Sequence, residues 1–182
     1  MIDLLGNYNP AWSGELRPIG EGRWQKEPFD KWWDRNKVRL GLLHPRIAEQ
    51  WGHRHWQNSP FCHLDLDRIT WRSERWPTQR LLAEVVRPDS ADETSLAHDY
   101  ALYRDRESEP SETMRATGTW DIPIVIIDAP NGVLRSTGPD TRRFYLIEGH
   151  QRMRCLAAFH RHAKCANQHK TFIISYPEMV CG

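Results

Sequence analysis

Long apolar runs, a strong charge bias and clustered cysteines are all missing from this sequence. No stretch approaches the roughly 20 apolar residues that a membrane-spanning helix needs. The stretch from Met1 to Gly20 lacks the basic start and apolar core of a secretory signal. The 182 residues carry a formal net charge of only +1, so bulk charge does not point to a nucleic-acid binder. We therefore predict a cytoplasmic protein without membrane insertion.

Cysteine is scarce, and its four positions are spread unevenly: Cys62, Cys155, Cys165 and Cys181. This distribution favours a reduced, cytosolic state. One late segment combines cysteine with histidine: Cys155, His160, His162, Cys165 and His169. That spacing matches no common zinc pattern, so a buried cysteine beside surface histidines is favoured over a metal centre. The sequence therefore predicts no metal site.

Tryptophan is abundant instead, with nine residues in the chain. Six of them precede residue 60: Trp12, Trp24, Trp32, Trp33, Trp51 and Trp56. They either supply the core of an N-terminal segment or form a surface for base stacking or protein docking. The first interpretation is favoured. We predict a Trp-rich, partly helical arm over residues 1–58 and a separate domain over 59–182.

The second segment alternates strand and helix patterns, which predicts an α/β (mixed α+β) fold. The expected strands are 64–71, 122–128, 144–147 and 171–175. The expected helices are 77–86, 96–106, a turn at 111–116 closed by Gly118, and a helix that follows Gly149 to about residue 163. The stretches 89–95 and 129–141 are predicted as loops. The uninterrupted apolar run at 124–127 indicates a strand that is buried on both faces.

The chemistry is expected at the strand–turn–helix around Gly149. The strand at 144–147 runs into Glu148-Gly149-His150-Gln151-Arg152, and helical spacing begins at once. A glycine permits a tight bend and a close approach of a ligand to the backbone. The first amides of a helix lack intrahelical partners and carry partial positive charge, which makes a site for anions such as phosphate.

Arg152 strengthens this prediction. Its spacing from Cys155 and Phe159 places it on the inward side of the helix, whereas Arg154 and Arg161 are expected to face outward. An inward arginine requires an anionic partner. The partner is either a bound phosphate or an internal carboxylate such as Glu148, and both alternatives stay open at this stage.

Three further arginines flank the same strand: Arg135, Arg142 and Arg143. They could contact a second phosphate or a nucleic-acid backbone. A solvated loop is the favoured interpretation for all three.

The stretch Glu148-Gly149-His150-Gln151-Arg152-Met153-Arg154-Cys155-Leu156-Ala157-Ala158 resembles the turn of the ParB/sulfiredoxin superfamily, whose pattern is Gly-x-x-Arg followed by alanines. Ile122-Pro123-Ile124-Val125-Ile126 is similar to the proline-led strand that precedes this turn in the family. Pro77-Thr78-Gln79-Arg80 resembles a ParB proline–glutamine–arginine segment. The resemblance covers about residues 62–176. It implies a ParB/sulfiredoxin-like, nucleotide-binding domain with the arm appended.

Members of this superfamily differ in activity. Sulfiredoxins carry a cysteine where this chain has His150, and segregation ParB proteins need a downstream helix-turn-helix domain, so neither role is expected. Small-molecule kinases of the fold carry an Asp-Gly-His-His-Arg turn with an upstream glutamate base, and Glu74 is the residue that could take that place. Stand-alone members also act in plasmid fertility inhibition and are associated with ATPase and DNase activity, which the chain length fits.

The resemblance and the turn together imply a set of roles. Gly149 and the amides of residues 150–152, with Gln151 among them, are expected to hold phosphates, and Arg80 and Arg135 to bind further phosphate oxygens. The expected catalytic residues are Glu74, Glu148, His150 and Arg152. In this scheme His150 is an acid, base or phosphate donor, and Glu74 or Glu148 activates water or a hydroxyl or holds nucleotide-bound Mg²⁺. ATP or another NTP is the expected cofactor.

Three functions follow as hypotheses. The leading one is NTP hydrolysis, coupled to DNA cleavage, in a phosphohydrolase of the ATPase or nuclease type. The second is a kinase that acts on a small molecule such as a free amino acid. The third is a non-catalytic regulator that senses a nucleotide and docks a protein partner through the Trp-rich arm. The predicted partners are therefore a nucleotide, DNA and a protein.

Overall fold

The computed structural model describes residues 1–5, 14, 16–20, 26–55, 59, 61, 64–87 and 93–177, with the backbone alone over 93–97. The α/β class predicted from the sequence is confirmed, because helices accompany two sheets. The chain forms two compact units that interleave along the sequence. The first contains Met1–Trp71, Asp128–Thr141 and Ile174–Gly182, and the second contains Arg72–Ile127 and Arg142–Ile173. The predicted division after residue 58 stays a prediction.

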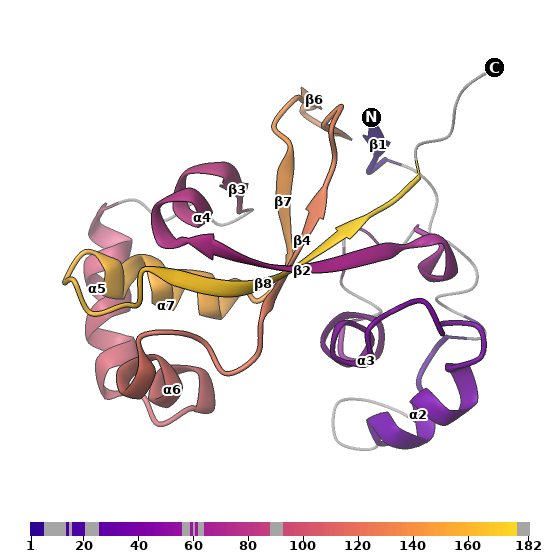
Figure 1. Ribbon diagram of the computed structural model, residues 1–182, viewed down its shortest axis with the longest axis horizontal. Coiled ribbons are helices and arrows are strands. Elements are labelled where there is room, and N and C mark those ends of the chain that lie inside the picture. Colours follow the sequence, from indigo (N-terminus) through magenta and orange to yellow (C-terminus); the bar gives the residue numbers. More distant parts are fainter. Residues whose placement is uncertain are drawn as a thin grey trace. The chain divides into compact units, whose positions relative to one another are not determined.

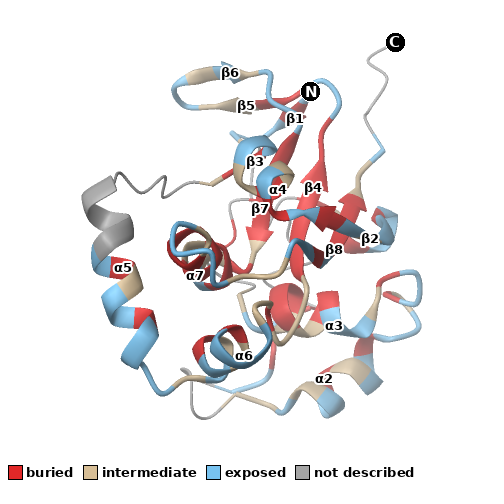
Figure 2. Cartoon of the chain, turned by 60° about the vertical axis from the view of Figure 1, so that its left-hand side comes forward, coloured by how far each residue is buried: buried red, intermediate tan, exposed pale blue. Residues whose placement is uncertain are grey.

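The second unit is built on a five-stranded sheet in the order β2-β8-β4-β7-β3 (Figure 1). The strands are β2 (Thr70–Pro77), β3 (Val85–Val86), β4 (Ile124–Asp128), β7 (Phe144–Glu148) and β8 (Gln168–Ser175). Every residue of β4 is buried, as its apolar run predicts for a central strand (Figure 2). β3 and β7 run parallel, so their carboxyl ends lie at the same edge of the sheet.

The helices of this unit are α4 (Thr78–Glu84), α5 (Glu93–Asp105), α6 (Glu109–Thr117) and α7 (His150–His160). α7 contacts both α5 and α6. Its inner face is apolar, and Met153, Leu156 and Phe159 lie in one buried cluster with residues of β4 and β7. Gly118 ends α6 in the left-handed region (φ 72°), as the sequence predicts. The core of the unit therefore lies between the sheet and this helix group.

The first unit holds the Trp-rich segment. Its helices are α2 (Phe29–Asn36), α3 (Pro45–Ile47), a π-helix at Ala48–His53 and a 3₁₀ turn at Leu66–Arg68. A small sheet has the order β1-β5-β6, formed by Ile2–Asp3, Val133–Arg135 and Gly138–Asp140. Trp32 and Trp51 are fully buried, and the two side chains supply much of this unit's core. Packing thus accounts for these two tryptophans, while Trp12, Trp24 and Trp56 lie outside the described residues.

Several predicted boundaries are wrong. The strand predicted over 64–71 begins only at Thr70, as β2. Before it, Leu66–Arg68 form the 3₁₀ turn. The helix expected over 77–86 ends at Glu84, and the next two residues form β3. The helix expected to reach residue 163 ends at His160. The loop predicted over 89–95 gives way to α5 at Glu93, and residues 89–92 lie outside the described part.

The loop predicted over 129–141 is also wrong, because this stretch contains β5 and β6, which form an antiparallel pair. β5 also pairs in parallel with β1, with Ile2 beside Val133. A short segment with two glycines carries little local strand signal, and its partner lies more than a hundred residues away in the sequence. Only long-range pairing identifies it as sheet. Within the described residues, no helix is long and apolar enough to cross a membrane.

Candidate functional site

The turn at Gly149 lies where β7 ends and α7 begins. β7 is buried except at Glu148, which is partly exposed. Gly149 is the N-cap of α7 and has φ 103°, a conformation that side-chain-bearing residues rarely adopt. The first intrahelical hydrogen bond runs from the amide of Met153 to the carbonyl of Gly149, at 2.9 Å. The predicted strand–turn–helix is therefore present.

The need for glycine at this corner has a structural cause. A Cβ on Gly149 would lie 2.6 Å from Cγ2 of Ile124 on the neighbouring strand β4, closer than two non-bonded carbon atoms approach each other in proteins. The tight bend expected from the sequence is confirmed. The close neighbour of the Cα atom, however, is the Ile124 side chain, so the glycine itself is no indication of a ligand at this position.

The amides of the first turn of α7 provide the stronger argument. Gly149 has no side chain with which to cap the helix, and the first turn contains no acidic residue. Residues 150–152 form the first turn of α7, at the positive end of the helix dipole. His150 is partly buried and Gln151 is exposed, so the start of the helix is accessible from solvent at Gln151. This arrangement favours an anion.

Arg152 lies on the buried side of α7, as predicted, and only 6% of the residue is exposed. Its Nη1 donates a 2.6 Å hydrogen bond to the carbonyl of Ile122, and its Nη2 lies 3.5 Å from Oε1 of Glu148. The carboxylate alternative is thus realised in the structure. The guanidinium lies beneath the first turn of α7 and adds positive charge there. Its position is fixed by the Ile122 carbonyl and by Glu148.

Arg87 is a residue of interest that the sequence analysis missed. It directly follows β3, which pairs in parallel with β7 through Val85–Phe144 and Val86–Tyr145. Its Nη1 is buried and has no hydrogen-bond partner among the described residues. Only the strand register places this residue at the same edge of the sheet as Gly149, and no local sequence signal reports that register.

Glu74, the predicted base, lies on the edge strand β2. It accepts hydrogen bonds from Nε of Arg72 at 2.6 Å and from Nε1 of Trp76 at 2.7 Å. These bonds, that of Arg72 first, lower the pKa of its carboxyl and make it a weaker base. β2 is separated from β7 by β8 and β4, so three strand spacings, roughly 14 Å, lie between them. The sheet therefore does not bring Glu74 to the turn.

The arginines predicted to bind phosphate are occupied elsewhere. The guanidinium of Arg80 stacks on the Trp76 ring at 3.7 Å from its centroid, and its Nε pairs with Glu84 at 3.0 Å. Arg135 lies in the first compact unit, where its Nε is 3.7 Å from a carboxylate oxygen of Asp140 in the paired strand. Arg143 lies over the ring of Phe144 at 5.0 Å. The described contacts of these residues are intramolecular.

The cysteine–histidine segment has a different character from the one expected. Burial raises the pKa of the Cys155 thiol to about 12, so this cysteine is inert, as the buried-cysteine interpretation requires. His169 was expected at the surface and is instead fully buried. Its Nε2 lies 2.9 Å from the hydroxyl of Thr78 and its Nδ1 lies 2.8 Å from that of Thr119. Burial lowers the pKa of His169 to about 4, so the ring is neutral.

Arg154, predicted to face outward, keeps 36% of its side chain exposed, but it has a partner that the spacing did not predict. It forms two hydrogen bonds with Asp99 of α5, at 3.0 Å and 2.6 Å, and the Asp99 side chain is completely buried. This pair ties α7 to α5. Its origin is tertiary, because the spacing of α7 alone gives no sign of a buried carboxylate on another helix.

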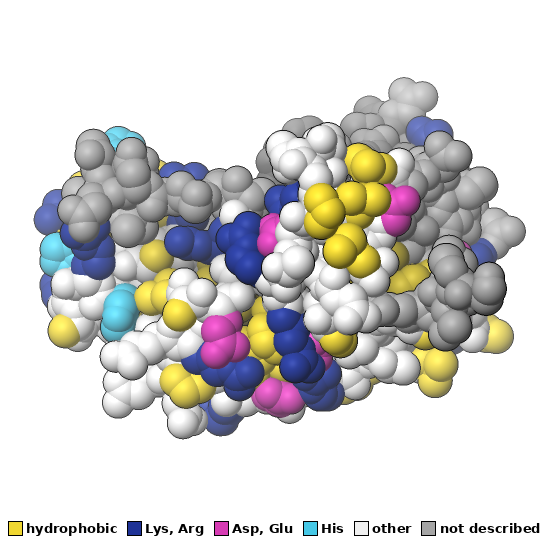
Figure 3. Space-filling model, turned by 90° about the horizontal axis from the view of Figure 1, so that it is seen from above, with side chains coloured by type: hydrophobic (Ala, Val, Ile, Leu, Met, Phe, Trp, Pro, Cys, Tyr) yellow, Lys and Arg dark blue, Asp and Glu magenta, His cyan; other side chains and the backbone are white. Residues whose placement is uncertain are grey.

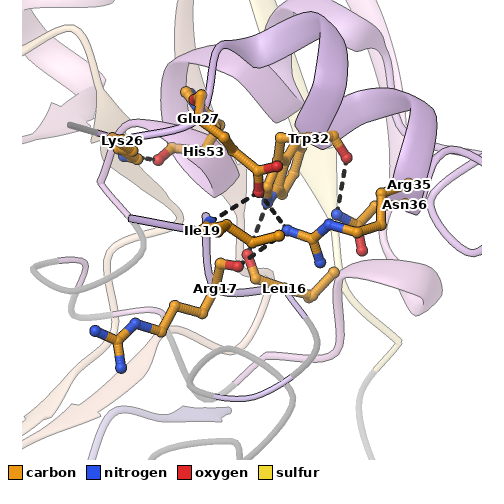
Figure 4. Close-up of polar contacts among 9 residues, drawn as sticks. All are labelled: Leu16, Arg17, Ile19, Lys26, Glu27, Trp32, Arg35, Asn36 and His53. Atoms are coloured by element: carbon orange, nitrogen blue, oxygen red, sulfur yellow. Dashed lines mark hydrogen bonds and ion pairs between the residues drawn. The ribbon is translucent and has the colours of Figure 1, made fainter. Parts of the chain in front are cut away.

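The polar cluster of the first unit holds its irregular segments in place (Figure 4). The indole N–H of Trp32 donates to the carbonyl of Leu16 at 2.8 Å, and the Glu27 carboxylate accepts from the amide of Ile19 and from Arg35. Lys26 donates to the carbonyl of His53 at the end of the π-helix. Burial, followed by the charge of Arg54, lowers the pKa of that lysine. These contacts satisfy backbone groups, which supports a structural role for the cluster.

Among the described residues, no group of three or more His, Cys, Asp or Glu could hold a metal ion. Mg²⁺ is commonly bound by one or two carboxylates together with substrate phosphates. Glu148, the acid next to the turn, fits that requirement only for a metal carried by a nucleotide. No family model matches the chain, and neither a curated protein nor a solved structure matches it.

Proposed function

We propose that the protein binds the phosphate groups of a nucleotide, such as ATP or another NTP, at the start of α7. The observation that carries this proposal is the first turn of the 11-residue helix α7, in which the N-cap residue makes no side-chain hydrogen bond, no acidic residue is present and a buried arginine lies beneath. The amides of residues 150–152 would donate to phosphate oxygens, and the helix dipole with Arg152 would stabilise their charge. Mg²⁺ would arrive on the nucleotide and neutralise part of that charge.

Hydrolysis of the nucleotide is the leading reaction in this proposal. His150 is adjacent to the amides and is the candidate to exchange a proton with the phosphate or with water. Glu148 is the nearer carboxylate to the turn, and its pairing with Arg152 would orient it. Coupling to DNA cleavage, as in plasmid fertility inhibition, and transfer to a small molecule remain proposals. The distance of Glu74 from the turn argues against Glu74 as the base of a kinase reaction.

A regulator that binds a nucleotide without turnover is the second candidate. It is favoured because the two glutamates proposed as bases, Glu74 and Glu148, are both paired with arginines. On the face seen in Figure 3, acidic side chains are interspersed among the basic ones, and this pattern gives no specific support to a DNA-binding surface there. Phosphate release, measured with and without DNA, separates the hydrolase from the regulator. Product analysis with free amino acids tests the kinase.

Gln151→Glu provides a direct test of binding. The substitution places an acid at the second position of α7, where it interacts favourably with the dipole and should stabilise the helix by about 0.5 kcal/mol. The same charge would repel a phosphate. Nucleotide affinity, measured by calorimetry with a non-hydrolysable triphosphate, should therefore fall at least tenfold while the melting temperature is kept or raised.

Gln79→Glu is the matched control. Gln79 is also an exposed glutamine at the second position of a helix, and the first turn of α4 likewise contains no acid. This variant should bind the nucleotide as the wild type does. If Gln151→Glu and the wild type bind the triphosphate equally, the turn is not the binding site. If the wild type binds no nucleotide, the proposed function fails.

A further inference from the structure

The five-stranded sheet ends on one side in a long strand, β2 (Thr70–Pro77). β2 has eight residues, and β8 is its neighbour on one side, with no described strand on the other. At the opposite end of the sheet, β3 has only two residues, and so short an edge offers little backbone for pairing. The first four residues of β2 are all exposed, and so is Arg75. β2 therefore presents a sheet edge that is long enough to pair with a further strand.

The charged residues of β2 follow the alternation of a strand. Arg72 and Glu74 share one face, where Nε of Arg72 lies 2.6 Å from Oε1 of Glu74, and Arg75 belongs to the other face. The two paired side chains stay 43% and 39% exposed. Charges on an edge strand usually oppose pairing between edges, because like charges meet in many registers. The order of charges in β2 leaves one register in which they attract.

Two copies of β2 can pair antiparallel about a twofold axis only in certain registers. Residues directly opposite each other either both direct their amide and carbonyl groups to the partner strand or both direct them away. Because these groups alternate along a strand, the axis has to pass through a residue and not between two residues. A centre at Arg72, Glu74 or Arg75 would set that charged side chain against its own copy. A centre at Ser73 instead sets Arg72 opposite Glu74 of the second copy, and Glu74 opposite Arg72.

The centre at Ser73 has two further advantages. The Arg72–Glu74 pairs of the two copies form a cluster of four charges, in which each charge has an opposite charge beside it and across from it. On the other face Arg75 comes opposite Trp71, which is 37% exposed, and an arginine beside an indole ring is a favourable pair. Residues 70–76 of both copies take part, so this register uses nearly the whole strand.

We propose that two copies of this chain associate through β2, antiparallel and centred on Ser73, so that their five-stranded sheets join into one continuous sheet. The partner is a second copy because the charges of β2 complement those of the same strand turned about a twofold axis. The inference is independent of the proposed phosphate site, because β2 lies three strands away from β7 and its turn.

Ser73→Cys tests the register directly. In the proposed dimer the two Cα atoms of residue 73 lie roughly 4.5–5.5 Å apart, a separation that a disulfide spans. Mild oxidation of the full chain should therefore give a disulfide-linked dimer on a non-reducing gel, with the 73–73 link identified by peptide mapping. Thr70→Cys is the matched control, an exposed position of the same strand whose two copies would lie roughly 20 Å apart. It should give no more linked dimer than the wild type, which reports any linkage through the native cysteines.

Reversal of the charges tests the attraction across the strands. Arg72→Glu and Glu74→Arg should each raise the dissociation constant of the dimer about tenfold or more in sedimentation velocity, because each sets like charges opposite each other twice. The double variant Arg72→Glu/Glu74→Arg restores opposite charges, and its dissociation constant should return to within about threefold of the wild-type value. Melting at a concentration at which the wild type is monomeric should show little change, since an exposed ion pair contributes little to folding.

Each contrary result overturns the inference. If the wild type stays a monomer at every concentration, β2 does not pair with its own copy, and a strand of a different protein becomes the candidate partner. If the wild type dimerises but Ser73→Cys forms no 73–73 disulfide, the register is wrong. If the single charge reversals leave the dissociation constant unchanged, the dimer uses another surface.

Discussion

The buried histidine of the second unit predicts a specific dependence of stability on pH. The Thr78 hydroxyl donates its proton to the carbonyl of Ala166 at 2.6 Å, so it accepts from Nε2–H of His169. The hydroxyl of Thr119 must then donate to Nδ1. Protonation of Nδ1 would place its N–H opposite the donating hydroxyl of Thr119. It would also charge a ring that is fully buried. The native state therefore requires the neutral imidazole.

The magnitude follows from the pKa of His169, which burial lowers from 6.5 to about 4. Between these values the unfolded chain binds the proton and the folded chain does not, so stability falls as the pH drops through this window. Each pKa unit corresponds to about 1.4 kcal/mol, so the full effect amounts to about 3 kcal/mol. Above pH 6.5 the contribution is fully present, because His169 is then neutral in both states.

His169→Gln is the informative variant, because its amide can donate to Thr78 and accept from Thr119 without titrating. Urea unfolding is followed between pH 7.5 and pH 4 by tryptophan fluorescence, to which Trp120, with its ring 4.6 Å from that of His169, contributes. The free energy of unfolding should decline more steeply in the wild type than in the variant, by about 3 kcal/mol over the window. Parallel declines of the two proteins would refute the assignment of a neutral, buried His169.

Three further substitutions or treatments test the geometry of α7. Gly149→Ala should destabilise the protein by about 3 kcal/mol in urea unfolding, from the positive φ and the contact with Ile124, and a loss under 1 kcal/mol would contradict this packing. Arg154→Ala should cost about 3 kcal/mol because it leaves buried Asp99 unpaired, and Asp99→Asn in the same background should recover part of that loss. Cys155 should react with a thiol reagent only after unfolding, and labelling of the native protein at that residue would contradict its burial.

Local pattern predicts much of the fold around the candidate site. The apolar run that became β4 and the strand, glycine and helix of the turn were all predictable, because burial periodicity and a left-handed corner act over a few residues. The inward orientation of Arg152 followed from helical spacing alone. The hairpin of β5 and β6 was not predicted, because it is stabilised by the pairing of these two strands with each other and of β5 with the distant strand β1.

The site itself was less predictable than the fold. Spacing identified an arginine that requires an anion, but the choice between a ligand and Glu148 depends on where the carboxylate and the Ile122 carbonyl lie in space. Glu74 was suggested by its position in the chain, and the strand order places it three strands from the turn. Arg87 gave no local signal, because its relation to the turn arises from the register of two strands.

The amino-acid sequence by itself determined the α/β class, the buried strand and the strand–glycine–helix corner, since these depend on short-range periodicity and backbone freedom. Only the tertiary structure decided which partners the ionisable groups take. His169 is buried between two threonines, and Arg154 forms hydrogen bonds with Asp99 on another helix. The Ile124 side chain fills the space beside Gly149. Such contacts join residues 25 or more positions apart in the chain, and the packing that brings them together has no local signature.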